Sequence, residues 1–124
     1  MIVGIGVDIV QVSRVEHLID KWGEKFALRI LSDEELSSFS GNKIQTNFLS
    51  KQFAAKEAVS KALGTGLKGI RLSEISVLRD KKGKPFVKFS GRAAVEALVV
   101  GAKYVHVSIA DERDYAIAYV IIDK

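Results

Sequence analysis

The first nine residues predict a β-strand with one face almost bare of side chains. Successive side chains of a strand point to opposite faces, and one face here is apolar and consists of Val3, Ile5, Val7 and Ile9. The other face consists of Ile2, Gly4, Gly6 and Asp8. Glycine inside a strand loses packing, and it often marks a place where a ligand or another backbone comes close. The strand therefore predicts a close neighbour on its glycine face.

Asp8 stands on that glycine face. Aspartate is disfavoured in strands, and a carboxylate that is buried without a partner costs several kcal/mol, so something must compensate its charge. A nearby cation is the simplest compensation. The alternative is an aspartate at a strand end that accepts hydrogen bonds from turn amides, and the residue alone leaves both interpretations open.

Length and composition limit the class of protein. The chain has 124 residues, of which 48% are hydrophobic, and we expect one domain over residues 1–124. The absence of cysteine excludes disulfide scaffolds, thiolate zinc sites and thiol nucleophiles. The apolar runs at residues 2–7 and 97–102 are far shorter than the roughly 18 residues that a membrane span needs. The N-terminus lacks the pattern of a signal peptide, so we expect a cytoplasmic protein with no membrane partner.

Periodicity and capping signals predict an α+β fold with a mainly antiparallel sheet. Two capping boxes, Ser13 to Glu16 and Ser32 to Glu35, predict helix starts. We expect a polar loop over residues 40–47. The expected elements, in chain order, are a strand at 2–9, a helix from 13 to 26 with a possible break at Gly23, a short helix at 32–39, a helix at 48–63, strands at 73–79 and 84–89, a helix at 90–100, and strands at 104–110 and 115–122.

The helix at 48–63 carries apolar residues nearly all round, which predicts contacts on both of its sides. Glu57 and Lys61 lie one turn apart on it and project together. Such a pair can hold a magnesium ion and a phosphate side by side, because Mg²⁺ usually takes one or two carboxylates and keeps its other positions for water and phosphate. The alternative is an exposed ion pair that stabilises the helix by about 0.3 kcal/mol.

The glycine-rich turn that follows, Gly64 to Gly66 with Thr65 between, offers backbone amides that a phosphate can use. It is not a Walker loop, because it ends a helix instead of opening one. The alternative interpretation is a helix C-cap and nothing more.

The net charge of +4 predicts an anionic partner. If the first helix continues through Gly23, its basic residues fall in a band about 80° wide. This predicted basic ridge consists of Arg14, His17, Lys21 and Lys25. A merely solvated helix face is the alternative. A nucleic-acid partner is disfavoured, because sheet-based RNA modules interleave exposed aromatics with basic residues and the predicted strands here are mainly Val and Ile.

Two separated motifs resemble the holo-acyl-carrier-protein synthase family, within the wider phosphopantetheinyl transferase superfamily. They are the stretch 4–9, Gly-Ile-Gly-Val-Asp-Ile, and the stretch 53–66, which contains a Lys-Glu-Ala-x-x-Lys core. Arg14, the helix start at 31–35 and the closing stretch 105–109 also match, so the resemblance covers nearly the whole chain. One departure is Asp111, where many relatives carry histidine; we assign it no catalytic role.

The resemblance implies transfer of 4′-phosphopantetheine from coenzyme A to a serine of apo acyl carrier protein, in support of fatty acid biosynthesis. It implies Mg²⁺ held by Asp8 and Glu57, and Lys61 on a phosphate oxygen. The serine proton would pass to Glu57 or to a metal-bound water.

Further residues follow from the same resemblance. Coenzyme A would approach the turn formed by Gly64, Thr65 and Gly66. His106 is interpreted either as a coenzyme A phosphate contact or as a partly buried structural residue. The basic ridge would receive the acidic carrier protein. Relatives form trimers, so we expect Asp8 and Glu57 to meet across or close to a subunit interface.

Overall fold

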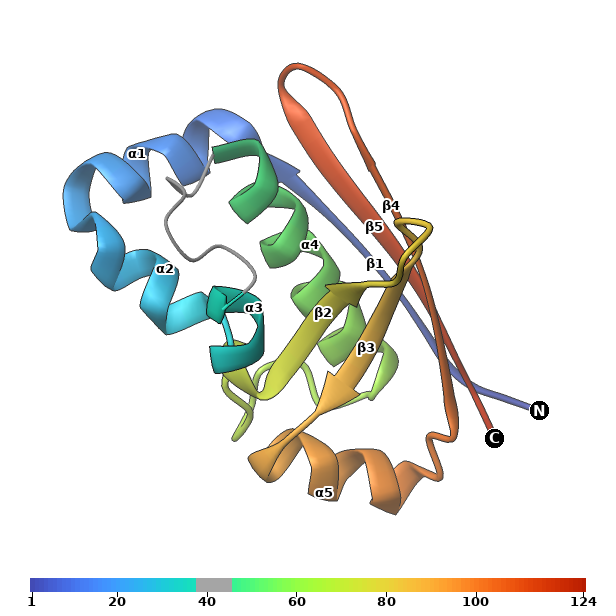
Figure 1. Ribbon diagram of the computed structural model, residues 1–124. Helices are drawn as coiled ribbons and strands as arrows, with labels where there is room; N and C mark the ends of the chain where they lie inside the picture. The colour runs from blue at the N-terminus through green and yellow to red at the C-terminus, as the bar shows by residue number, and fades with distance from the viewer. Residues whose placement is uncertain (38–45) are drawn as a thin grey trace.

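The computed structural model describes residues 1–37 and 46–124 (Figure 1). Its elements, in chain order, are β1 (Ile2–Gln11), α1 (Val12–Trp22), α2 (Glu24–Ile30), α3 (Asp33–Ser37), α4 (Thr46–Ala62), the 3₁₀ helix η1 (Leu72–Glu74), β2 (Ile75–Arg79), β3 (Pro85–Phe89), α5 (Gly91–Val100), β4 (Tyr104–Asp111) and β5 (Tyr115–Asp123). The expected end of the short helix near Phe39 and most of the expected loop at 40–47 lie outside the described residues. The α+β class is confirmed.

The strands form two antiparallel sheets. A three-stranded sheet has the order β1-β5-β4, and β2 pairs with β3 in a separate hairpin. Helix α4 lies between the two sheets, with α1, α2 and α3 beyond it, and α5 closes the end near both termini (Figure 1). Asp8 lies opposite Ala118 on the edge strand β1, and the pairing with β5 continues beyond it to Gln11.

Gly4 and Gly6 let the backbone of α4 lie directly on β1. A Cβ atom on Gly4 would come within 1.9 Å of the Ala62 carbonyl oxygen, and one on Gly6 within 1.9 Å of the Ala58 carbonyl oxygen. No side chain can occupy either space. The sequence prediction of a close neighbour on this face is confirmed, and the neighbour is a helix of the same chain.

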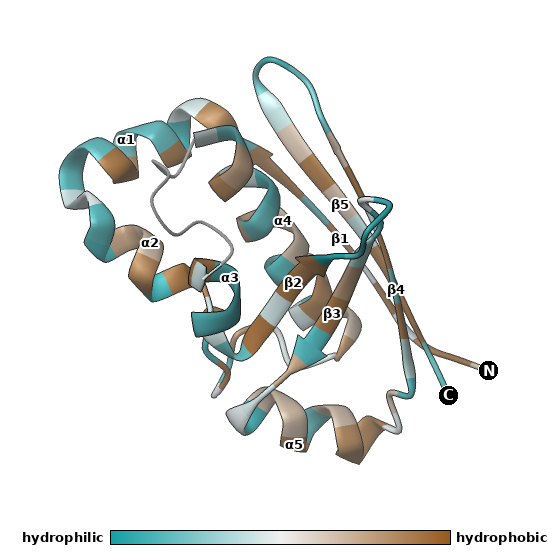
Figure 2. Cartoon of the chain, in the orientation of Figure 1, coloured by the Kyte–Doolittle hydropathy of each residue, from teal (hydrophilic) through white to brown (hydrophobic). Residues whose placement is uncertain are grey.

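The apolar face of β1 consequently points away from the core. Ile5 is 59% exposed and Ile9 is 61% exposed, although both belong to the regular apolar alternation. Neighbouring β5 continues the same outer face with exposed Tyr115, Ile117 and Tyr119. Brown, hydrophobic colouring marks parts of β1 and β5 (Figure 2), and among the described residues no helix lies on the outer side of these strands (Figure 1). Such a face is unusual for a protein that stays monomeric.

Helix α4 is the centre of the core. Residues on most of its circumference are buried, among them Leu49, Ala55, Ala58 and Val59. The sheet buries one side of the helix, with Val120 and Ile122 of β5 against it, and β2 packs on another. This explains the apolar residues nearly all round the helix, and it confirms that α4 has neighbours on both sides.

Two details of the predicted helices differ. Gly23 adopts φ 59° and divides the expected helix 13–26 into α1 and α2. The Ser13 capping box is wrong, because α1 already begins at Val12 and no side chain caps it. Instead, the Val12 amide donates to the Asp114 carbonyl oxygen at 2.8 Å, so the β4–β5 turn fixes the helix start.

The second capping box and the hairpin agree with the prediction more closely. The Ser32 amide donates to Glu35 Oε1 at 2.8 Å, and the Glu35 amide donates to Ser32 Oγ at 3.2 Å. The β2–β3 turn is held by Asp80, whose Oδ1 accepts hydrogen bonds from the Lys82 and Lys84 amides. Ser73, expected in a strand, lies in η1.

Candidate active site

The Asp8 carboxylate meets Lys61 at the surface between β1 and α4. Lys61 Nζ lies 3.1 Å from Asp8 Oδ1, and it also donates to the Val7 carbonyl oxygen at 2.9 Å. The Asp8 side chain is only 16% exposed, whereas that of Lys61 is 51% exposed. Of the two interpretations that Asp8 alone left open, the structure supports the nearby cation, because Lys61 lies beside the carboxylate.

Glu57 belongs to the same cluster. Burial raises the pKa of its carboxyl above the ordinary glutamate value, and the negative charge of Asp8 raises it further. The positive charges of Lys61 and Arg14 oppose this increase in pKa. Asp8, Lys61 and Arg14 of the same chain therefore all act on the Glu57 carboxyl. Arg14, expected on the partner-binding ridge, lies close enough to influence Glu57.

The two carboxylates suit a hard divalent cation. Mg²⁺ prefers oxygen ligands and usually binds one or two carboxylates together with water and phosphate. Asp8 and Glu57 supply such a pair from two rigid elements, and the described residues contain no cluster of three or more histidine, cysteine or acidic side chains that would favour another metal. The donor set fits Mg²⁺ with phosphate as its further ligand.

The glycine-rich turn beside Lys61 is a helix C-cap with an open surface. Its two glycine amides are already used, because Gly64 N donates to the Lys61 carbonyl oxygen and Gly66 N donates to the Ser60 carbonyl oxygen, each at 3.0 Å. The expectation that these two amides are free for a phosphate is therefore wrong. A Cβ on either glycine would meet nothing within 4 Å, so the backbone of the turn stays open to close approach.

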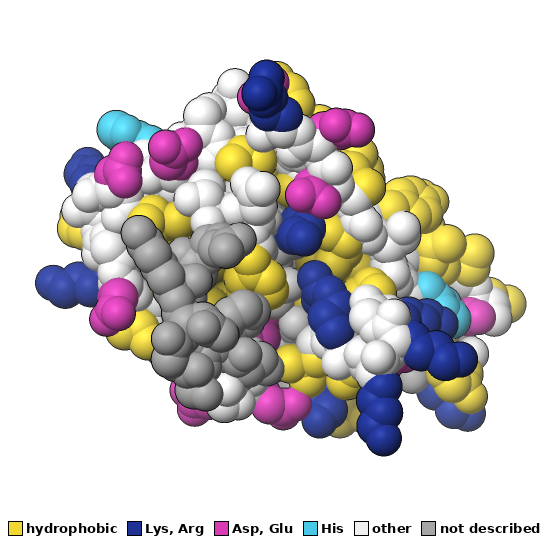
Figure 3. Space-filling view, turned by 45° about the horizontal axis from the view of Figure 1, so that its top comes forward, with side chains coloured by type: hydrophobic (Ala, Val, Ile, Leu, Met, Phe, Trp, Pro, Cys, Tyr) yellow, Lys and Arg dark blue, Asp and Glu magenta, His cyan; other side chains and the backbone are white. Residues whose placement is uncertain are grey.

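The predicted basic ridge is shorter than expected. Arg14, His17 and Lys21 are exposed on α1, but Lys25 follows the break at Gly23 and belongs to α2. The predicted band of four residues required a continuous helix, so the prediction is wrong for Lys25. Acidic side chains also lie among the basic ones on the side of α1 in the space-filling view (Figure 3).

Beside these helices lies a hollow that sequence reasoning missed. It has apolar walls from Phe26, Leu28 and Phe53, and two arginines, Arg29 and Arg71, also line it. The hollow combines contributions from α2, α4 and the segment before η1. No local pattern in the sequence links these segments.

His106 is exposed on β4, opposite Ile121 of β5. The interpretation of a partly buried structural histidine is wrong, and the possible phosphate contact stays a prediction. His106 lies on the outer face of the sheet, the side that α4 does not cover. Asp111 is exposed at the end of the same strand.

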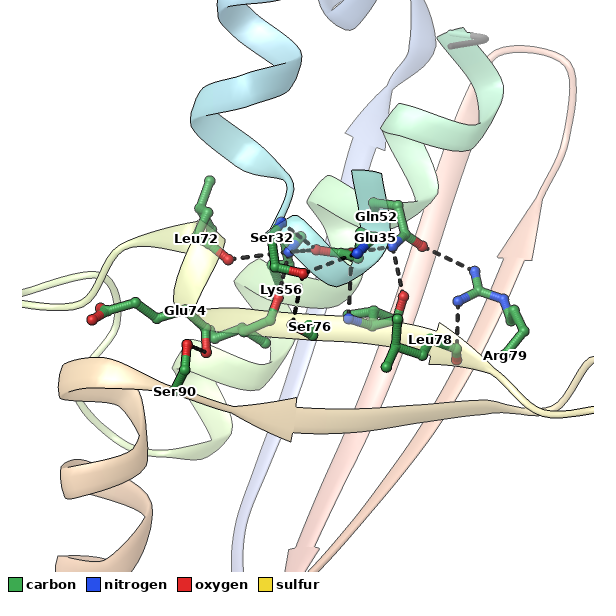
Figure 4. A network of polar contacts seen from close by, with 12 residues as sticks. Ser32, Glu35, Gln52, Lys56, Leu72, Glu74, Ser76, Leu78, Arg79 and Ser90 are labelled. Atoms are coloured by element: carbon green, nitrogen blue, oxygen red, sulfur yellow. Dashed lines mark hydrogen bonds and ion pairs between the residues drawn. The ribbon is translucent and has the colours of Figure 1, made fainter. Parts of the chain in front are cut away.

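Behind the site lies a buried polar network that the sequence did not reveal (Figure 4). Lys56 of α4 and Glu35 of α3 form an ion pair in which both side chains are at most 1% exposed. Burial lowers the pKa of Lys56, and the charge of Glu35 opposes that decrease. Gln52 joins them from one turn earlier on α4, where its Nε2 donates to Glu35 Oε2 and to the Val77 carbonyl oxygen. The one available signal was a lysine, Lys56, on a helix that carries apolar residues nearly all round.

The chain is similar to known proteins along nearly its whole length. Residues 4–120 match the 4′-phosphopantetheinyl transferase superfamily. The chain is 49% identical to a holo-[acyl-carrier-protein] synthase of Vibrio cholerae, covering 100% of this chain and 99% of that protein. The crystal structure of the Neisseria meningitidis holo-[acyl-carrier-protein] synthase superposes with a TM-score of 0.92 at 40% identity, with 100% of each chain covered.

A second solved structure carries a ligand. The Helicobacter pylori holo-[acyl-carrier-protein] synthase in complex with coenzyme A matches with a TM-score of 0.82 at 28% identity, covering 96% of this chain and 99% of that one.

The helices of the described residues were also compared with the length and hydropathy of a membrane span. None of them is both long and apolar enough to cross a membrane.

Proposed function

Because the chain belongs to the 4′-phosphopantetheinyl transferase superfamily, and within it to the holo-[acyl-carrier-protein] synthases, we propose that residues 1–124 form one transferase domain. The domain moves 4′-phosphopantetheine from coenzyme A to a serine of an apo acyl carrier protein. The observation that carries the proposal is the convergence of Asp8, Glu57 and Lys61, two acids and a cation from β1 and α4, beside an open glycine turn.

The reaction is a displacement at phosphorus. The serine hydroxyl oxygen forms a bond to the phosphorus that carries the pantetheine arm, and the bond from that phosphorus to the bridging oxygen breaks. Adenosine 3′,5′-bisphosphate leaves with the bonding electrons. Such a transfer needs charge neutralisation and in-line positioning more than it needs a covalent intermediate.

Asp8 and Glu57 are the residues that would hold Mg²⁺, which when bound neutralises charge on the diphosphate. Glu57 is the side chain that we propose accepts the serine proton, because burial and the charge of Asp8 both raise its pKa and so favour its binding of a proton. Lys61 is half exposed and joined to Asp8 by one salt bridge, so its ammonium group can turn from Asp8 to a phosphate oxygen.

The carrier protein would dock on α1 and α2. Exposed Arg14, His17 and Lys21 offer positive charge to an acidic partner, and the hollow between Phe26 and Phe53 offers an apolar contact. Charges at such a surface mainly raise the association rate and fix the register of the partner.

The exposed apolar face of β1 and β5 supports a homo-oligomer, and we propose a trimer. Light scattering tests this: a monomeric mass at full activity would argue against it. Cytoplasmic location and a role in fatty acid biosynthesis form part of the same proposal.

The decisive experiment mixes the protein with coenzyme A, Mg²⁺ and an apo acyl carrier protein, and weighs the carrier by mass spectrometry. We expect the carrier to gain one phosphopantetheine group, and adenosine 3′,5′-bisphosphate to appear in equal amount. Binding of the carrier with no gain in mass, while a known synthase modifies the same preparation, would show a carrier-binding module instead of an enzyme.

A further inference from the structure

The buried network behind the site is saturated with hydrogen bonds. Lys56 Nζ contacts Glu35 Oε1 at 2.5 Å, the Leu72 carbonyl oxygen at 3.1 Å and the Ile75 carbonyl oxygen. A lysine ammonium has three donors, and each therefore has a partner. Among the described residues, no buried side-chain nitrogen or oxygen lacks one.

Glu35 is satisfied in the same way. Its Oε1 accepts from Lys56 and from the Ser32 amide, and its Oε2 accepts from Gln52 Nε2 and, at 3.3 Å, from the Val77 amide. The Ser32 hydroxyl in turn accepts from Ser76 Oγ at 2.7 Å. The network thus joins α3, α4, η1 and β2 through directional contacts (Figure 4).

A buried ion pair of this kind is weak evidence for stability. Desolvation of the two charges offsets much of their attraction, and well-packed apolar residues are often as stable or more stable. What an ion pair and its hydrogen bonds add is a fixed direction, because each bond depends on angle as well as on distance. The position of Lys56 on α4 indicates which residues of the site these directional contacts orient.

Gln52 and Lys56 lie one turn apart on one side of α4, and Glu57 and Lys61 lie one turn apart about 100° further round the helix. On another side, the carbonyl groups of Ala58 and Ala62 rest against Gly6 and Gly4. The glycine contacts limit how closely the helix approaches β1. They present smooth backbone, however, and do little to stop the helix turning about its axis.

We propose that Glu35 and Lys56 are positioning residues that set the rotation of α4, and thereby aim Glu57 and Lys61 at Asp8. This inference rests on the proposed function for its catalytic consequence. A rotation of about 20° would shift the Cα atoms of α4 by about 0.8 Å, given a helix radius of about 2.3 Å. Displacements of about 1 Å at a reacting centre can reduce a rate by about 10²-fold.

The test compares wild-type protein with the double variant Glu35→Leu/Lys56→Met, which keeps the site filled but removes its directional contacts. Val100→Ala in α5 is the control, because Val100 packs on the core from a helix that carries no residue of the site or of the network. All proteins are assayed at a temperature where circular dichroism shows them folded. Glu35→Gln, which keeps the size of the side chain and weakens the ion pair, is measured in parallel in case the double variant does not fold.

We expect the double variant to lose about tenfold or more in kcat, with a smaller change in the KM for the carrier, because the basic docking residues of α1 take no part in the network. Glu35→Gln is expected to lose less, in the same direction. The control is expected to keep both constants. A double variant or Glu35→Gln variant with the kcat of the control would overturn the inference.

A second measurement does not depend on activity. Backbone amide signals from Glu57 to Lys61 are followed by NMR relaxation dispersion, which detects slow changes in helix orientation. We expect exchange broadening there in the double variant and none in the control. If the wild-type protein transfers nothing, the proposed function fails, yet selective broadening on α4 still supports the positioning role and its absence still refutes it.

Discussion

Lys61 and Asp8, 53 residues apart in the sequence, join helix α4 to strand β1 through a contact of 3.1 Å. The lysine places a positive charge beside the one carboxylate of the strand, and Glu57 adds a second acid from the same helix. The candidate site is thus assembled where two elements cross. Its parts depend on that crossing as much as on their own chemistry.

Replacing Asp8 by asparagine removes one charge from the acid pair and keeps its shape. We expect Asp8→Asn to lower the transfer rate by about 10²-fold or more at saturating Mg²⁺, the effect of losing one preorganised electrostatic group. The rate is read from the mass of the carrier over time. Asp114→Asn, an exposed aspartate in the β4–β5 turn, serves as the control. Equal turnover in the two variants would remove Asp8 from the site.

Gly6 has no room for a side chain. Gly6→Ala would place a Cβ 1.9 Å from the Ala58 carbonyl oxygen, so either α4 or β1 has to move. We expect the free energy of unfolding in urea to fall by about 1–3 kcal/mol or more. Ser13→Ala, at an exposed helix position without a capping bond, should change it by less than about 0.5 kcal/mol. A Gly6→Ala protein as stable as the wild type would contradict the close contact.

The raised pKa of Glu57 makes the stability of the metal-free protein depend on pH. An acid whose pKa is higher in the folded than in the unfolded state binds more protons when folded. Stability therefore decreases as pH rises from the unfolded pKa through the folded one. Glu57→Gln should remove this decrease and leave the variant more stable than wild type at neutral pH. Urea unfolding at several pH values measures it; parallel curves for both proteins would show that the folded-state pKa of Glu57 is ordinary.

The basic residues of α1 should act on the carrier and spare the nucleotide. We expect Lys21→Glu to lower kcat/KM for the carrier several-fold and to weaken its salt dependence, with the KM for coenzyme A unchanged. Lys25→Glu, beyond the break at Gly23, provides the comparison and should have the smaller effect. A change in the KM for coenzyme A equal to that for the carrier would argue against a docking role for α1.

Much of the architecture was predictable because it rests on local signals. The alternation in β1, the capping box at Ser32, the break at Gly23 and the turn at Asp80 each depend on residues close together in the chain. The Ser13 box failed because a distant carbonyl group, that of Asp114, fixes the start of α1. Local signals decide an element only where no tertiary contact competes with them.

The site was predictable in part for a related reason. Asp8 drew attention as an acid on a glycine face, and Glu57 and Lys61 as a pair on a helix that is apolar nearly all round. Each kept an ordinary alternative, and only the two motifs together indicated a site. Glu35 and Lys56 could not be paired, because 21 residues separate them and only the packing of α3 on α4 brings them together. The glycines of β1 indicated which face of the strand has a close neighbour, but not that the neighbour is α4.

The contact between β1 and α4 shows that residues of the motif at 4–9 have two different roles. Gly4 and Gly6 face the backbone of α4, so they report on architecture, whereas Asp8 reports on chemistry. A descendant of this protein that kept both glycines and lost the acid would retain the shape and be inert. In genome surveys, the glycine pair by itself therefore indicates the fold and does not indicate whether the protein is an active enzyme.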